Sequence, residues 1–353
     1  MSLRVHIRLG DDVLIRDVVD GVWAEPSSKK ADMVIGQQSW GLPGLVDAHA
    51  HIASDTLFAP GDIAAAAGRL RAALPAGVML ILDKGWTDDT AIRAADSVSL
   101  DERPDLEAAE QILTVEGGYF PGFGMVVGPD LLSEATTRQA EAGSGWVKLI
   151  GDWPRRGLGP VANFTTTQLR HAVLAAETAG ARVAIHTMAP DVPSQAVAAG
   201  VHSIEHGLFL SEDDLAALGE REGMWVPTVL RIEETVAQLG AESSGGRLLA
   251  AGLENTRRLL GAAVEAGVRV LAGTDLVGSP TNIASEAIRM GELGLTNSQV
   301  IGAISTAAFT ATGRDTAFTP GSPANVVLFA DDPATNLEIL RHPQHILRRG
   351  RLL

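Results

Sequence analysis

Four junctions in the middle of the chain pass from a helix-type segment, through a glycine, directly into apolar residues. These junctions are Ala76-Gly77-Val78, Ala179-Gly180-Ala181, Ala199-Gly200-Val201 and Ala266-Gly267-Val268. Glycine is common just after the last turn of a helix, because it adopts a left-handed backbone conformation without a steric penalty. An apolar run that follows at once is what a helix-to-strand connection needs. The spacing therefore predicts repeated β/α units with a parallel sheet.

The number of these units predicts how the sheet is arranged. Short β-type runs occupy 45–51, 78–82, 112–115, 146–150, 182–186, 202–205, 225–229 and 268–272. Alanine- and leucine-rich segments of helical character lie between most of them, at 63–74, 169–179, 213–222 and 248–266. Eight such units close a (β/α)8 TIM barrel, so we predict this α/β fold. An open doubly wound sheet is the alternative. No G-x-G-x-x-G fingerprint or P-loop supports nucleotide binding.

The two chain ends differ from the middle. Residues 3–15 alternate apolar and polar side chains, as a half-buried strand does, and short apolar runs follow at 18–19 and 33–35. Similar runs occur at 325–329, 345–347 and 351–353. We therefore predict a small β-sandwich-like lobe formed by both chain termini, with a small antiparallel sheet. The predicted domains are this lobe at 1–43 plus 317–353, and the barrel at 44–316.

Composition limits the possible partners and site chemistries. The chain has 43 acidic and 28 basic residues, a formal charge of −15, which argues against binding to nucleic acid or an anionic membrane. Cysteine is absent, which excludes disulfides and thiolate metal ligands. No apolar run approaches membrane-spanning length. These features predict a cytoplasmic enzyme with a small-molecule substrate, and they leave a homo-oligomer open.

The first predicted barrel strand ends in two histidines. Side chains alternate along a strand, so Asp47, His49 and His51 share one face, and two adjacent imidazoles are able to hold one metal ion. This pattern alone is weak. However, Lys148, His186, His206 and Asp275 lie at the ends of other predicted strands, where barrel enzymes keep their chemistry. Each has an ordinary structural explanation by itself, but their placement at one rim predicts a metal site.

These residues carry a resemblance to the amidohydrolase superfamily of metal-dependent hydrolases, in its binuclear subtype with a bridging lysine. The similar segments are Gly44-Leu45-Val46-Asp47-Ala48-His49-Ala50-His51, Val147-Lys148-Leu149, Ile185-His186, Ser203-Ile204-Glu205-His206-Gly207 and Gly273-Thr274-Asp275. Within the superfamily, Ile204-Glu205-His206-Gly207, Val226-Pro227-Thr228 and Ala76-Gly77-Val78 resemble the prolidase and imidazolonepropionase-like branch.

The resemblance implies two divalent metal ions, zinc being the first choice among several metals that such ligands accept. It places His49, His51 and Asp275 on the more buried ion, and His186 and His206 on the other. Lys148 would bridge the two. Its ammonium would be repelled by the cations, whereas the neutral amine would add carbon dioxide and become an anionic carbamate with one oxygen for each metal.

The implied activity is hydrolysis of a C–N amide bond in a dipeptide, an N-acyl amino acid or a cyclic amide. A water between two metals loses a proton near neutral pH and becomes the nucleophile. Asp275 would take the proton and deliver it to the leaving group. A lactonase or phosphotriesterase is the nearest alternative, since the same nucleophile attacks esters and phosphoryl centres. A catalytically silent metal-binding barrel is the alternative from another class.

Other site residues follow less directly from the sequence. The run His202-Ser203-Ile204-Glu205-His206 also fits the inverted zinc-peptidase motif H-x-x-E-H, but flanking glycines and β-branched residues disfavour the helix that this motif requires.

Tyr119, in a glycine-rich loop after the third strand, is a candidate hydrogen-bond donor to a substrate carbonyl. Arg231, after the seventh strand, is a candidate partner for a substrate carboxylate. Packing and solvation are equally good explanations for these two.

Overall fold

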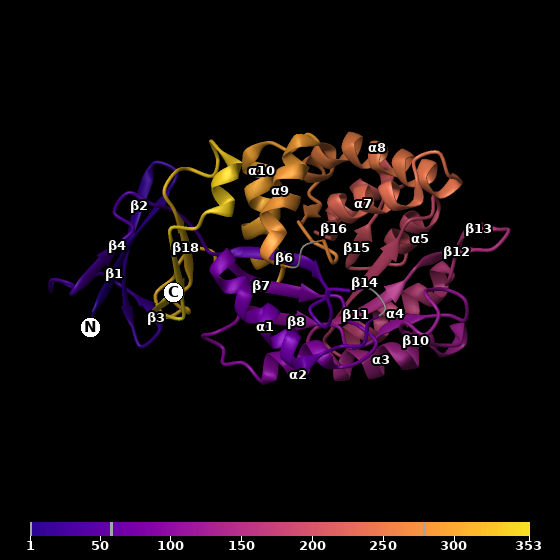
Figure 1. Cartoon of the computed structure of the whole chain (residues 1–353), viewed down its shortest axis with the longest axis horizontal. Coiled ribbons are helices and arrows are strands. Elements are labelled where there is room, and N and C mark those ends of the chain that lie inside the picture. The colour runs from indigo at the N-terminus through magenta and orange to yellow at the C-terminus, as the bar shows by residue number, and fades with distance from the viewer. Residues whose placement is uncertain (1, 57–58, 278–279) are drawn as a thin grey trace.

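The computed structural model describes residues 2–56, 59–277 and 280–353. A sheet that contains strands from both chain ends lies on one side of the molecule, and a larger body of parallel strands and helices lies on the other (Figure 1). Residue 1, the first of the predicted terminal lobe, lies outside the described residues. The terminal lobe and the domain boundaries stay predictions.

The terminal sheet is mixed. Its strands are β1 (Leu3–Leu9), β2 (Asp12–Val19), β3 (Val22–Ala24), β4 (Met33–Ile35), β5 (Trp40–Leu42), β18 (Val326–Phe329), β19 (His345–Arg348) and β20 (Arg351–Leu352). The order is β20-β19-β18-β5-β1-β2-β3, with β4 paired to β1. β5 joins the two chain ends, because it pairs antiparallel with β18 and parallel with β1. The prediction of an antiparallel sheet was wrong for two of the pairings of β1, which is parallel to β4 and to β5 but antiparallel to β2.

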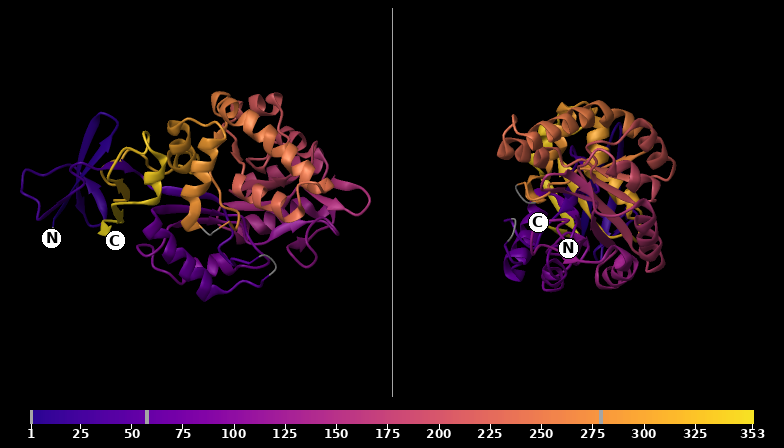
Figure 2. Two further views of the ribbon diagram at one scale, coloured as in Figure 1. Left: turned by 45° about the horizontal axis from the view of Figure 1, so that its top comes forward. Right: turned by 90° about the vertical axis from the view of Figure 1, so that its right-hand side faces the viewer.

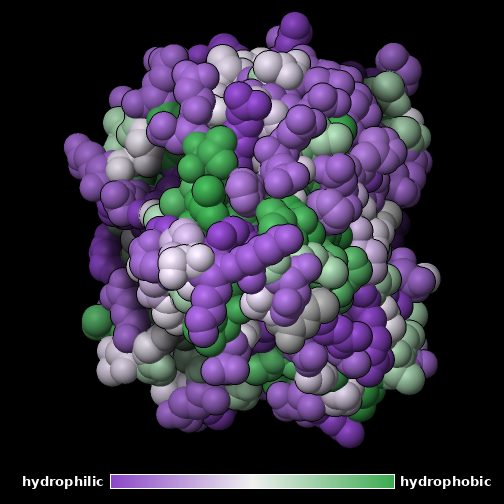
Figure 3. All heavy atoms as spheres, turned by 90° about the vertical axis from the view of Figure 1, so that its left-hand side faces the viewer, coloured by the Kyte–Doolittle hydropathy of each residue, from purple (hydrophilic) through white to green (hydrophobic). Residues whose placement is uncertain are grey.

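The prediction of one strand over 3–15 was also wrong. The chain turns at Gly10, whose φ is +63°, and β1 and β2 form an antiparallel hairpin. Gly10-Asp11-Asp12 interrupts the alternating pattern, so the sequence did carry a turn signal here that the prediction overlooked. Val5, Ile7 and Trp23 are buried in the core of this sheet. Figure 3 shows the molecule from the side of this sheet, where most of the face is hydrophilic and hydrophobic side chains are confined to small areas.

The larger body contains two parallel sheets. The first pairs β6 (Leu45–Ala50), β7 (Val78–Asp83) and β8 (Asp105–Ala108). The second has the order β10-β9-β11-β14-β15-β16-β17, and its strands are β9 (Ile112–Thr114), β10 (Met125–Val126), β11 (Trp146–Ile150), β14 (Arg182–Thr187), β15 (Ser203–His206), β16 (Met224–Val226) and β17 (Arg269–Val270). A small hairpin of β12 (Asp152–Arg155) and β13 (Gly159–Ala162) follows β11.

Within the described ranges, these pairings leave two sheets and not one continuous ring. Backbone hydrogen bonds nevertheless link their edges. On one side the Ala48 N–H donates to the Ala272 carbonyl at 2.9 Å, and on the other the Trp86 N–H donates to the Glu110 carbonyl at 3.0 Å. The sequence analysis missed β8, which pairs with β7, because two of its four residues, Asp105 and Glu107, are acidic and only Ala108 is fully buried. The parallel strands and these links are consistent with the predicted barrel.

Helices cover the outside of the parallel strands, as both views in Figure 2 show. They are α1 (Ile63–Ala73), α2 (Thr90–Asp96), α3 (Leu132–Ala142), α4 (Thr166–Thr178), α5 (Val192–Ala198), α6 (Glu212–Glu220), α7 (Val229–Leu239), α8 (Ser244–Glu265), α9 (Ile283–Glu292), α10 (Asn297–Ile301) and α11 (Ala307–Ala311). Gly77, Gly180, Gly200 and Gly267 all have φ between +77° and +89°, as the predicted helix-to-strand junctions require. Among the described helices, none has the length and apolar character needed to span a bilayer.

Candidate metal centre

One cavity brings together the six side chains that the sequence placed at the strand ends. It has a volume of about 160 Å³, and its lining includes His49, His51, Lys148, His186, His206 and Asp275. His49 comes from β6, Lys148 from β11, His186 from β14 and His206 from β15, while His51 and Asp275 follow β6 and β17. Carboxyl ends of parallel strands meet at one edge of a sheet, which explains why residues so far apart in sequence converge.

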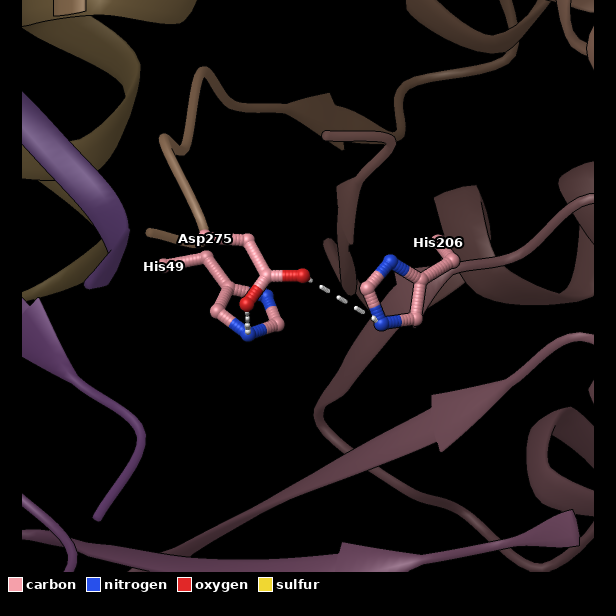
Figure 4. A group of neighbouring side chains, drawn as sticks. All are labelled: His49, His206 and Asp275. Atoms are coloured by element: carbon pink, nitrogen blue, oxygen red, sulfur yellow. Dashed lines mark ion pairs between the residues drawn. The ribbon is translucent and has the colours of Figure 1, made fainter. Parts of the chain in front are cut away.

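The carboxylate of Asp275 lies between two imidazole rings (Figure 4). Its Oδ1 is 3.6 Å from Nε2 of His49, and its Oδ2 is 4.0 Å from Nε2 of His206. These three residues each offer a ligand atom within 4.8 Å of the others, so they form a group able to hold a metal ion. Nε2 of His51 is also close, at 3.3 Å from Asp275 Oδ1. The ring of His186 lies 4.6 Å from that of His206, between centroids.

In His49, His51 and His206, the ring nitrogen Nδ1 contacts a neighbouring residue, and the other nitrogen, Nε2, lies on the side of Asp275. The first two of these contacts are made to a carboxylate oxygen and a carbonyl oxygen. Nδ1 of His49 is 2.6 Å from Oε2 of Glu205, and Nδ1 of His51 is 2.7 Å from the Gly85 carbonyl. A carbonyl only accepts, so Nδ1 of His51 must carry the proton, and the close carboxylate of Glu205 favours the same tautomer for His49. Each Nε2 is then unprotonated and directed toward Asp275. Metal-binding histidines are commonly oriented in this way.

His206 reaches the same state through a hydroxyl group. Its Nδ1 lies 2.6 Å from Oγ1 of Thr228, and this hydroxyl donates its own proton to the Pro227 carbonyl at 2.8 Å. The Thr228 oxygen must therefore accept from Nδ1–H of His206, which leaves Nε2 free to bind a metal.

The predicted strand over 225–229 was wrong at its end. β16 stops at Val226, because Pro227 lacks an N–H and Thr228 turns into α7 with φ +48°.

Backbone strain collects at the same place. His206, Thr228 and Asp275 have φ of +62°, +48° and +43°, a region that residues with a Cβ rarely occupy. Such strain persists only where the surroundings enforce it, and it is frequent at functional sites. One enforcing contact is Asp47, whose carboxylate accepts hydrogen bonds from the Thr274 hydroxyl at 2.6 Å and the Thr274 N–H at 3.0 Å. Asp47 thereby fixes the segment that carries Asp275 against β6.

Burial sets the protonation of the ligand groups. It lowers the pKa of His49 to about 4 and that of His206 to about 3, so both rings are neutral at pH 7, which is the form that binds metals. Burial also lowers the pKa of Lys148 to about 8. Nζ of Lys148 has no hydrogen-bond partner among the residues that the structure describes. A buried amine without a partner is costly unless something else binds it, so this observation fits the predicted bridging role.

A buried charge pair lies next to the site. Oε1 of Glu205 accepts a hydrogen bond from the Ser203 hydroxyl at 2.5 Å and lies 3.6 Å from Nζ of Lys84. Lys84 also stacks over the Trp146 ring, with Nζ 4.0 Å from its centroid. The sequence analysis missed Lys84. Its position two residues after the predicted strand 78–82, at the same rim as the other site residues, was the signal that could have found it.

The inverted zinc-peptidase motif is excluded by the local fold. Its glutamate and second histidine lie in strand β15 and not on a helix, so the two histidines do not share a helical face. His202 faces the outer helices: its Nδ1 accepts from the Val183 N–H at 3.1 Å, and its Nε2 is 3.3 Å from Glu177 of α4. His206 alone reaches the cavity.

Both predicted substrate-contacting residues line the cavity. Nε of Arg231 is 3.9 Å from Asp275 Oδ2, and its guanidinium also pairs with Glu234 at 2.8 Å. The ring of Tyr119 packs against Trp153, with 4.7 Å between centroids. Their position is thus compatible with contact to a ligand, while their roles stay predictions.

Comparison with known proteins identifies the class to which this fold and this site belong. The chain matches the model of the amidohydrolase family over residues 40–352, and it belongs to that family. Uncharacterized proteins of Mycobacterium tuberculosis (strain ATCC 25618 / H37Rv) and Mycobacterium bovis are each 32% identical to it, over 99% of this chain and 96% of the relative.

Solved structures share the fold over nearly the full length. A Xaa-Pro dipeptidase with bound methionine has a TM-score of 0.83 at 20% identity, with all of both chains covered. The ochratoxinase of A. niger has a TM-score of 0.82 at 18% identity and covers 99% of this chain and 95% of its own. A molinate hydrolase has a TM-score of 0.79 at 16% identity, with 100% and 94% covered. At these identities the likeness concerns the fold alone.

Proposed function

We propose that this protein is a metal-dependent hydrolase that cleaves a C–N amide bond. The observation that carries the proposal is the convergence of His49, His51, Lys148, His186, His206 and Asp275 on one cavity. Membership of the amidohydrolase family supports hydrolysis, and so do the names of structural neighbours that include a dipeptidase and a molinate hydrolase. The proposed substrate is a dipeptide, an N-acyl amino acid or a cyclic amide.

The residues present fit two divalent metal ions, with zinc as the first choice. His49, His51 and Asp275 would hold one ion, and His186 and His206 the other. Lys148, as the carbamate formed with carbon dioxide, would bridge the two, which its unpartnered and buried Nζ supports. When bound, such ions supply an activated water and polarise the substrate carbonyl.

The remaining steps belong to the side chains of this protein. Oδ2 of Asp275 faces the cavity side where Arg231 lies, 3.9 Å away. Asp275 would take the proton from the attacking water and return it to the leaving nitrogen, as general base and then general acid. Arg231 would pair with a carboxylate of the substrate, and the Tyr119 hydroxyl would donate to its carbonyl.

We also propose a closed barrel and an accessory lobe for this protein. We interpret the two parallel sheets as parts of one (β/α)8 barrel, since backbone hydrogen bonds cross between their edges. The strands of both termini would form the accessory β-sandwich-like lobe. We further propose a cytoplasmic protein that acts on a small molecule and binds neither nucleic acid nor membrane, either alone or as a homo-oligomer.

Metal analysis of protein grown with defined metals, followed by a substrate screen, tests the proposal. The screen contains N-acyl amino acids, dipeptides, cyclic amides, lactones and a phosphotriester. We expect about two metals per chain and hydrolysis of an amide. Hydrolysis of lactones or phosphotriesters alone would favour the alternative hydrolase classes. Two bound metals with no rate on any substrate, and no effect of Asp275→Asn, would indicate a silent metal-binding protein.

A further inference from the structure

A second pocket adjoins the metal cavity. It has a volume of about 420 Å³ and lies between the β12–β13 hairpin, the end of α7 and the start of α8. Figure 1 shows these elements at the end of the body far from the terminal sheet. Phe120, Trp153, His186, Met188 and Thr235 line both this pocket and the metal cavity. The two spaces are therefore neighbours that share a wall at His186.

The sizes of the two spaces indicate a substrate that occupies both. Pockets that enclose a drug-sized ligand have volumes of about 300–1,000 Å³. The metal cavity, at about 160 Å³, is smaller than this range, whereas the adjoining pocket, at about 420 Å³, falls inside it. The metal cavity alone thus has room for the reacting group and little more. Any larger part of the substrate needs the adjoining pocket.

The walls of the adjoining pocket are mainly apolar. Trp153, Leu239, Leu248 and Leu249 contribute to them, and no lysine or arginine does so within the described part of the chain. The one carboxylate is Asp152, whose Oδ2 accepts the Met188 N–H at 2.8 Å. Its Oδ1 is buried and has no hydrogen-bond partner among the described residues, and burial raises the pKa of Asp152 to about 6. The other described walls offer nothing that would compensate a positive charge. An uncharged, apolar group suits these walls best.

The two ends of the combined space differ in charge. Arg231 lies beside Asp275 on the metal-cavity side, 3.9 Å from its carboxylate, and lines only the metal cavity. The apolar pocket meets the metal cavity at His186 and Met188, and also at Thr235, one helical turn from Arg231. If Asp275 delivers a proton to the leaving nitrogen, the leaving amine and its carboxylate lie near Asp275 and Arg231. The acyl group would then take the adjoining pocket, whose described lining has no cation to pair with the carboxylate.

We propose that the adjoining pocket binds the apolar acyl chain of an N-acyl amino acid, which makes long-chain N-acyl amino acids the preferred substrate class. This inference rests on the proposed function and narrows it, because it favours an N-acyl amino acid over a dipeptide with a free amine. Burying a methylene group contributes about 0.8 kcal/mol. We therefore expect kcat/KM to rise about two- to fourfold for each methylene added to the acyl chain.

The test is a kinetic series on the metal-loaded protein with N-acetyl-, N-butyryl-, N-hexanoyl- and N-octanoyl-leucine, together with leucyl-leucine. Leu248→Trp would fill the half-buried pocket wall, and Leu174→Trp, at an exposed leucine of α4 outside both spaces, is the matched control. We expect the octanoyl derivative to exceed the acetyl one at least tenfold in kcat/KM. Leu248→Trp should reduce this ratio at least fivefold, whereas Leu174→Trp should leave it unchanged.

Three results would overturn the inference while an amide hydrolase remained. They are a ratio near one in the unmodified protein, a ratio that Leu248→Trp does not change, and a preference for leucyl-leucine over octanoyl-leucine. If no amide is hydrolysed, the proposed function fails. Calorimetry with the same ligands then decides whether the adjoining pocket binds an acyl chain. Tighter binding of octanoyl-leucine than of acetyl-leucine, lost in Leu248→Trp, would support an acyl-binding pocket, and equal binding would overturn it.

Discussion

Nδ1 of His49 lies 2.6 Å from Oε2 of Glu205, and both side chains are buried. The contact joins β6 to β15, so a residue of one strand fixes the ring of a predicted metal ligand on another. Lys84, at 3.6 Å from the other oxygen of Glu205, helps to compensate its charge. A carboxylate in this position holds the imidazole proton on Nδ1 and increases the basicity of Nε2.

Replacing Glu205 should therefore weaken metal binding. In Glu205→Gln the amide is a poorer acceptor, and Lys84 loses its buried counter-charge. We expect affinity for the ion held by His49 to fall by about 10- to 100-fold. Competition with a chelator, measured by atomic absorption, checks this value. Glu177→Gln, at the exposed partner of His202, is the control and should bind metal normally. Equal affinities for all three proteins would show that Glu205 does not orient His49.

Asp275→Asn should affect turnover more than metal content. The asparagine keeps the shape of the side chain but accepts protons poorly, and general acid–base catalysis contributes about 10²- to 10⁴-fold. We expect kcat on the best amide from the screen to fall by at least about 100-fold. Metal content, measured on the same sample, should fall much less. A variant that loses metal and activity in equal proportion would assign Asp275 to metal binding alone.

Two buried lysines face the centre of the body, and one experiment decides which of them bridges the metals. Lys148 lines the cavity, whereas Lys84 lies beneath it against Glu205 and Trp146. We expect Lys148→Ala to hold fewer than two metals per chain and Lys84→Met to hold about two, each checked for folding by circular dichroism. Full metal content in Lys148→Ala would remove the bridging model, and loss only in Lys84→Met would transfer the role to Lys84.

The sequence allowed prediction of the side chains that line the metal cavity far better than of the exact bounds of the strands that carry them. His49, His186 and His206 each follow an apolar run whose length and direction are readable locally, so their convergence followed from the barrel hypothesis. The left-handed glycines at Gly77 and Gly267 were predictable for the same local reason.

What the sequence could not reveal depends on contacts between distant residues. Lys84 resembled an ordinary lysine after a strand, and only the fold places it against Glu205. β8 was missed because its acidic residues contact arginines at the far end of the chain: Asp105 pairs with Arg348 at 2.6 Å. The apolar pocket beside the metal cavity is formed by segments about 130 residues apart at most, Phe120 and Leu249 among them, and no local pattern marks it.

A buried carboxylate at the start of α7 should make the free energy of unfolding depend on pH, and this dependence can be measured without metal. Glu286 of α9 is buried, and its two oxygens accept the N–H groups of Val229 and Leu230 at 2.6 and 2.9 Å. These are the first N–H groups of the helix that carries Arg231. Burial raises the pKa of Glu286 to about 8, with a smaller contribution from the charge of Asp47.

The sign of the effect follows from proton binding. Between the unfolded pKa near 4.5 and the folded pKa near 8, the folded protein binds the extra proton, so the free energy of unfolding decreases as pH rises through this range. Glu286→Gln removes the titrating group. In urea unfolding of the chelator-treated proteins, the wild type should lose on the order of 3 kcal/mol relative to Glu286→Gln between pH 5 and pH 8. Glu254→Gln, at an exposed position of α8, should follow the wild type. A constant difference between wild type and Glu286→Gln across this range would mean that Glu286 is already ionised at pH 5, held as a carboxylate by the two N–H groups of α7.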